Sequence, residues 1–139
     1  MSNNPKTESE IECLVDAEYE LDGNDCSYRR MLLIKHDYYS SDNEHGRFLL
    51  NSFLKSLSNG KFSLESIILI DSGVRIADSA IMQTLVNSGT VNTVYICSES
   101  LEYCGLSTPG YEHTVLPSSE IFDMLLWLQS EGEQLIIIE

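Results

Sequence analysis

Uninterrupted apolar runs of strand length constrain the fold of this chain more than any other feature of its sequence. Clear runs span residues 31–34, 67–70, 94–96 and 135–138, and a weaker one spans 113–116. Strands that are apolar throughout are typical of a parallel sheet that is covered on both faces. The runs therefore predict a mostly parallel sheet of about five strands.

Helical patterns lie between these runs. The first helix is predicted to begin at a capping box formed by Ser41 and Glu44, the second spans residues 79–88, and the last begins after Pro117. Their buried faces are marked by apolar residues at helical spacing, which are Leu49, Leu50, Phe53, Leu54 and Leu57 in the first helix and Ile121, Met124, Leu125 and Leu128 in the last. The alternation predicts a three-layer α/β/α fold with right-handed crossovers.

Residues 1–30 precede this pattern and have a different character. The first ten residues are polar, and residues 11–21 lead into the hairpin-turn dipeptide Asp22-Gly23. We expect a polar tail with an added strand or hairpin over 1–30, followed by a single α/β domain over 31–139. Cys13 and Cys26 are interpreted as small, half-buried hydrophobic residues.

The charge balance excludes several classes of function. Because 22 acidic residues outnumber 8 basic ones and the net charge is -14, we expect neither nucleic acid nor an anionic membrane as a partner. No apolar run approaches the roughly 20 residues that span a bilayer, and residues 1–10 contain no apolar signal segment. These features predict a cytoplasmic protein with free thiols. The absence of C-x-x-C pairs and of phosphate-binding glycine motifs predicts neither a metal site nor a cofactor.

Polar loops follow the first three strands of the predicted sheet, at residues 35–39, 71–75 and 97–104. Ligands of open α/β sheets bind at the carboxyl ends of the strands, so we expect these loops to form one cleft. The candidate binding residues in the first two loops are Asp37, Ser72, Gly73, Val74 and Arg75. The Asp-Ser-Gly turn suits close approach to a ligand, although an ordinary strand-to-helix turn explains it equally well.

The third loop contains two cysteines, Cys97 and Cys104. Cys97 ends a strand where a helical turn over 101–104 is predicted, and backbone N–H groups there would favour a thiolate. Glu99 and Glu102 would favour the neutral thiol, and Arg75 is the one basic side chain in the neighbouring loops. Two interpretations stay open: Cys97 is a reactive thiol, or it is a buried strand-end residue with Cys104 packed under the loop.

Four stretches of residues 31–138 resemble the DsrE/DsrF-like sulfur-relay superfamily. They are Leu33–Asp37 with Glu44-x-Gly46, then Phe53–Leu57, then Asp71–Val74, and lastly Cys97-x-x-Ser100-Leu101-x-x-x-Gly105-Leu106. The resemblance is to the C-terminal domain of YedF-type proteins in particular, which are described as sulfurtransferase-like and linked to selenium metabolism. It implies a DsrE-like fold.

The resemblance also implies a function for the third loop, which in YedF-type proteins reads C-G-T-C-L-x-x-Y-G-L. Cys97 matches the first cysteine, Ser100 stands at the second, and Cys104 replaces the tyrosine. In a sulfur-relay protein, Cys97 would carry a persulfide that Arg75 and the 72–74 amides stabilise. Cys104 would resolve this persulfide, and the implied partners are a TusA-like carrier and further copies of the chain. The alternative is a non-catalytic oligomerisation or partner-binding module that lost the family cysteine at Ser100.

Overall fold

The computed structural model describes residues 30–59, 62–130 and 134–139. Its strands are β1 (Arg30–Ile34), β2 (Leu64–Leu69), β3 (Val91–Cys97), β4 (Thr114–Leu116) and β5 (Gln134–Ile138). Its helices are α1 (Glu44–Asn59), α2 (Ala80–Asn87), α3 (Ser98–Cys104) and α4 (Ser118–Ser130), with a 3-10 helix, η3 (Asp71–Ile76). The predictions of a polar tail and an added strand or hairpin before β1, including those for Cys13 and Cys26, fall on residues 1–29 and lie outside the described residues.

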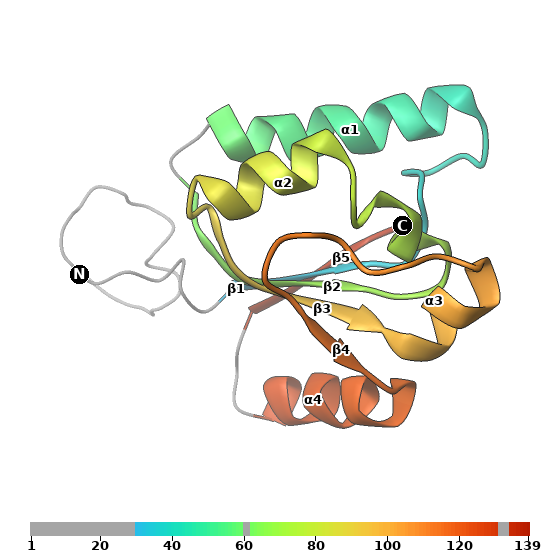
Figure 1. Cartoon of the computed structure of the whole chain (residues 1–139). Coiled ribbons are helices and arrows are strands. Elements are labelled where there is room, and N and C mark those ends of the chain that lie inside the picture. Colours follow the sequence, from blue (N-terminus) through green and yellow to red (C-terminus); the bar gives the residue numbers. More distant parts are fainter. Residues whose placement is uncertain (1–29, 60–61, 131–133) are drawn as a thin grey trace, which may run out of the picture.

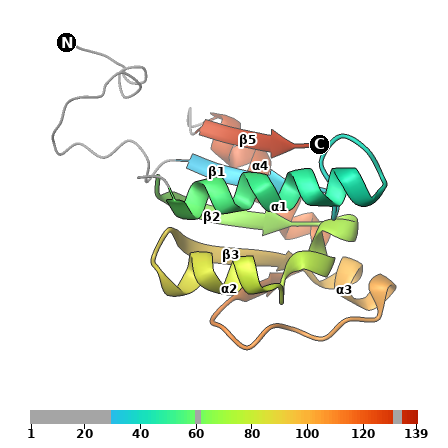
Figure 2. The same cartoon turned by 90° about the horizontal axis from the view of Figure 1, so that it is seen from above.

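The strands form one parallel sheet in the order β4-β3-β2-β1-β5. β1 is paired on both sides, since Leu32 lies beside Ile67 of β2 and beside Ile136 of β5. Because all strands run in one direction, their carboxyl ends share one edge, and the loops that follow β1, β2 and β3 begin there (Figure 2). The predicted α/β fold with a largely parallel sheet is confirmed.

Helices cover both faces of the sheet and define two core clusters. Figure 1 shows α1 and α2 on one face and α4 on the other. The larger cluster joins apolar residues of α1 and α2 to the sheet and includes Leu32 and Leu54. The smaller one lies under α4, and its buried members are Met31, Leu33, Ile68, Cys97, Ile121 and Leu128. The arrangement is the three-layer α/β/α fold that the alternating pattern predicts.

The start of α1 differs from the prediction. Its cap is Asn43, whose Oδ1 accepts a hydrogen bond of 2.8 Å from the Gly46 amide, so the capping box at Ser41 is wrong. The Ser41 carbonyl instead accepts from the Asn43 amide at 3.0 Å. This folds the preceding turn so tightly that a Cβ on Gly46 would lie 1.7 Å from the Ser41 oxygen.

The other helices agree more closely with the sequence patterns. Ser79 caps α2 by accepting from the Met82 amide at 3.3 Å, and Gly89 follows with a left-handed φ of 80°. α4 begins after Pro117, as predicted. In the part of the chain that the structure describes, no helix is both long and apolar enough to cross a bilayer.

Candidate functional site

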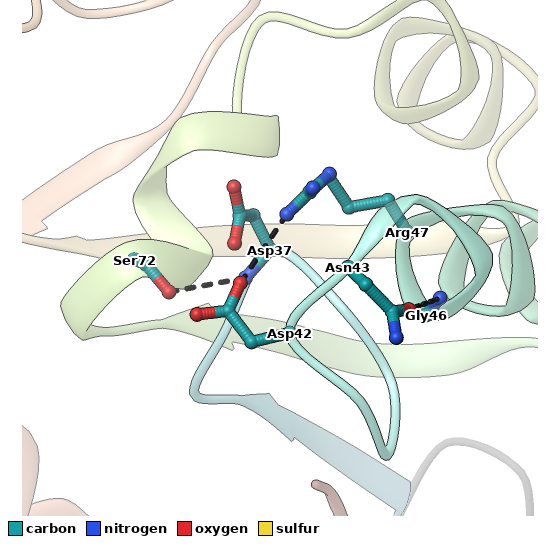
Figure 3. A network of polar contacts seen from close by, with 6 residues as sticks. All are labelled: Asp37, Asp42, Asn43, Gly46, Arg47 and Ser72. Carbon is teal, nitrogen blue, oxygen red and sulfur yellow. Dashed lines mark hydrogen bonds and ion pairs between the residues drawn. The ribbon is translucent and has the colours of Figure 1, made fainter.

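The three predicted loops are joined to one another at the carboxyl edge of the sheet. The Asp37 amide donates to Ser72 Oγ at 3.2 Å, which links the loop after β1 to η3 (Figure 3). The Asp71 amide donates to Ser100 Oγ at 2.8 Å, which links η3 to α3. The hydroxyls of Ser72 and Ser100 therefore accept backbone hydrogen bonds that hold the edge together.

Gly73 is required by the close packing of this edge. A Cβ at this position would lie 2.4 Å from the Ile34 carbonyl oxygen at the end of β1 and 3.4 Å from the His36 amide nitrogen. The adjacent Val74 is buried in the larger core cluster. Gly73 and Val74 thus position η3 against β1.

A cavity of about 210 Å³ lies on the α1 and α2 side of this edge. Its polar lining residues are Asp37, Arg47, Asn51, Arg75 and Ser79, and its apolar ones are Leu50, Leu54, Ile76 and Ile81. The structure therefore brings together two of the predicted binding residues, Asp37 and Arg75. No residue of the 97–104 loop lines this cavity. The cleft that was expected from three loops is instead formed by the loop after β1, by η3, and by helices α1 and α2.

Arg47 and Asn51 are functional candidates that the sequence analysis missed. They lie one helical turn apart on α1, beside Leu50 and Leu54 of its buried face. Arg47 Nη1 contacts Asp42 Oδ1 at 3.3 Å, and Figure 3 shows this guanidinium beside the loop that carries Asp37. The sequence marks Arg47 as a candidate only by placing an arginine at the border of the apolar face of α1.

The two cysteines belong to different layers of the molecule. Cys97 is 3% exposed and lies in the core cluster under α4, where its Sγ donates to Glu99 Oε1 at 3.6 Å. Cys104 is half-buried and packs against the cluster under α1 and α2. Both thiols are free, and each contacts a core cluster on a different face of the sheet.

Glu99 connects Cys97 to the start of α4. Its Oε1 accepts from the Ser118 amide at 2.6 Å and its Oε2 from the Ser118 hydroxyl at 3.1 Å. The Ser118 amide bond is the largest of the effects that lower the pKa of Glu99 from its ordinary value of 4.5. Glu99 therefore acts as a cap for the amino end of α4, supplied by a neighbouring helix.

Comparisons with known proteins give no further assignment, since no family model, curated protein or solved structure matches this chain. Within residues 30–59, 62–130 and 134–139, no group of three or more His, Cys, Asp or Glu side chains is arranged to hold a metal ion. The site is accordingly interpreted from its own geometry.

Proposed function

We propose that this chain is a non-catalytic, DsrE-like module that assembles with further copies of itself through α4. The observation that carries the proposal is the apolar outer face of this helix. Phe122, Leu126 and Trp127 are 51%, 67% and 59% exposed, although the opposite side of α4 already packs on the sheet. A helix that is apolar on both sides is typically covered on both sides, and a large exposed apolar patch marks an interface.

The surroundings of the cysteines support a module without catalytic thiol chemistry. A persulfide forms when a thiolate attacks a sulfane sulfur, which requires access to the thiol. Cys97 is almost fully buried, and Ser100, at the position of the second family cysteine, accepts a structural hydrogen bond from Asp71. Cys104 packs against the other core cluster, which does not favour a role as resolving thiol for Cys97.

The competing proposal is the sulfur-relay function that the resemblance implies. The contact of 3.6 Å between Cys97 Sγ and Glu99 favours it, because a carboxylate at this place can take the thiol proton. Ser118 weakens this base, since its amide and hydroxyl lower the pKa of Glu99. The geometry therefore supports the assembly module better.

The assembly function is tested with two matched substitutions of exposed phenylalanines. Phe122→Asp places a charge on the outer face of α4, and Phe48→Asp places one on α1, where Phe48 is 62% exposed. We expect light scattering to show an oligomer for the parent chain and for Phe48→Asp, and a monomer for Phe122→Asp. A parent chain that is monomeric at micromolar concentration would overturn the proposal.

The thiol chemistry is tested by mass spectrometry after incubation with a sulfane-sulfur donor. We expect no persulfide on Cys97 and slower alkylation of Cys97 than of Cys104, because Cys97 is buried and Cys104 is partly exposed. Cys97→Ser and Cys104→Ser, analysed in parallel, assign each adduct to its residue. A persulfide that disappears only in Cys97→Ser would favour the sulfur-relay function, with a TusA-like carrier as its candidate partner.

A further inference from the structure

The cavity between α1, η3 and α2 is independent of the assembly surface on α4. Its lining residues come from the loop after β1, from η3, from α1 and from the start of α2, and none belongs to α4 or to the loop with the cysteines. Figure 1 shows α1 and α2 on the face of the sheet opposite to α4. Its volume of about 210 Å³ lies below the range of drug-sized pockets, which starts near ~300 Å³. A small metabolite therefore fits within this cavity.

The charge of the cavity lining departs from that of the chain. The whole chain has 8 basic residues against 22 acidic ones, yet Arg47 and Arg75 line the same cavity. Among the described residues, Arg75 makes no ion pair, and the partner of Arg47 is the exposed Asp42 at 3.3 Å. An exposed pair of this kind exchanges readily for another anion. The guanidinium group is always charged and matches a carboxylate with two parallel N–H donors.

The other lining residues favour an anion with an apolar body and a single negative charge. The side chains of Leu50, Leu54, Ile76 and Ile81 provide an apolar wall, which suits a hydrocarbon body. Asp37 lines the same cavity and repels a second negative charge, so a dianion such as phosphate fits poorly. The same carboxylate can accept a hydrogen bond from an ammonium group on the ligand.

We propose that this cavity binds a small monocarboxylate with a branched apolar tail. Arg75 and Arg47 would bind the carboxylate, and the leucines and isoleucines would cover the tail. An apolar amino acid has the same chemistry with an added ammonium group, which Asp37 would accept. The residues that would contact the ligand lie on the loop after β1, on α1, on η3 and at the start of α2.

Isothermal titration calorimetry of the full chain with four probes tests this proposal. The probes are 4-methylpentanoate, leucine, 3-methylbutylamine and inorganic phosphate. We expect 4-methylpentanoate and leucine to bind, and the amine and phosphate not to bind. Tighter binding of leucine than of 4-methylpentanoate would identify the amino acid as the preferred form, and the reverse order would identify the simple carboxylate.

Matched arginine variants locate the binding. Arg75→Gln should weaken the binding of 4-methylpentanoate by about tenfold or more, because it removes a charged hydrogen-bond donor. Arg47→Gln should act in the same direction. Arg30→Gln is the control, because Arg30 starts β1 at the opposite end of the strand and donates to Gln134 at 3.1 Å. Asp37→Asn should weaken the binding of leucine and leave the binding of 4-methylpentanoate unchanged.

Several results would overturn the proposal. They are the absence of saturable binding of both carboxylates up to about 10 mM, tighter binding of phosphate than of either carboxylate, and equal effects of Arg75→Gln and Arg30→Gln. Circular dichroism of each variant establishes that a lost signal does not come from unfolding.

Discussion

Several residues at the carboxyl edge of the sheet have a structural role, because they allow neighbouring loops to pack closely. Ser72 and Ser100 each accept a backbone hydrogen bond from a neighbouring loop, and Gly73 lies directly against the end of β1. The sequence pattern that suggests ligand binding at these positions therefore has a structural explanation as well. Asp37 and Arg75 differ from them, because both line a cavity.

Replacement of Gly73 by alanine should destabilise the fold. The new Cβ would approach the Ile34 carbonyl oxygen to 2.4 Å, and this oxygen already accepts a hydrogen bond from the Ile70 amide at 3.2 Å at the end of β1. We expect a loss of about 1–3 kcal/mol or more in the free energy of unfolding, measured by urea denaturation. Gly110→Ala is the control and should be close to neutral, since no atom lies within 4 Å of a Cβ there. Equal stability of the two variants would contradict the packing argument.

The chemistry of individual residues was only partly predictable from the sequence. Asp37 and Arg75 follow from their places after strands, whereas Arg47 and Asn51 reach the same cavity from the side of α1. Arg47 and Asn51 line the cavity only because α1 packs beside η3, and no local sequence pattern encodes how two elements pack together. The side of the sheet on which Cys97 lies is equally hidden, because β3 is largely apolar on both of its faces.

At the scale of elements, α3 and α4 are coupled through one carboxylate. Glu99 of α3 accepts two hydrogen bonds from Ser118, the first residue of α4. The negative charge also lies at the amino end of α4, where the helix dipole favours it. The amino end of α4 is thus held by a titratable residue of the loop that contains the cysteines.

Glu99→Gln should lower the midpoint of thermal unfolding at neutral pH. Because the pKa of Glu99 is lowered in the folded state, its contribution to stability is present above its ordinary value of 4.5 and is lost as the pH falls below it. The difference in midpoint between the parent and Glu99→Gln should therefore shrink below pH 4.5, as measured by circular dichroism. Glu102→Gln, an exposed change on the same helix, should show no such pH-dependent difference.

The elements themselves were largely predictable, whereas the cap of α1 and the order of the strands were not. Apolar runs indicated all five strands, and capping residues indicated α2 and the start of α4. The cap of α1 was misassigned, because Ser41 and Asn43 both precede the helix and only the tight turn around Gly46 decides between them. The order of the strands depends on pairings between distant segments, which periodicity does not encode.

At the scale of the whole molecule, the large negative charge opposes the compact state. The net charge of the chain is -14. Within the described residues, Lys35 pairs with Glu139 and Arg47 pairs with Asp42, and both ion pairs lie at the surface. Screening therefore removes more repulsion than attraction.

Added salt should accordingly stabilise the protein. We expect the midpoint of thermal unfolding to rise by about 2–5 °C between about 20 mM and about 500 mM sodium chloride at pH 7. The same comparison at about pH 4.5, where protonated carboxyl groups remove much of the charge, should give a smaller change. A fall in the midpoint at pH 7 would show that attractive pairs dominate.

The position of β1 in the sheet has a consequence for how the protein is made. β1 is the first strand of the described chain, and one of its two neighbours is β5, the last one, with Arg30 and Gln134 separated by 104 positions. During synthesis, β1 and β2 can pair early, whereas β1 can pair with β5 only after β5 has left the ribosome. Among the described strands, β5 is the partner of this apolar edge of β1, so the edge lacks that partner until about a hundred further residues have been synthesised.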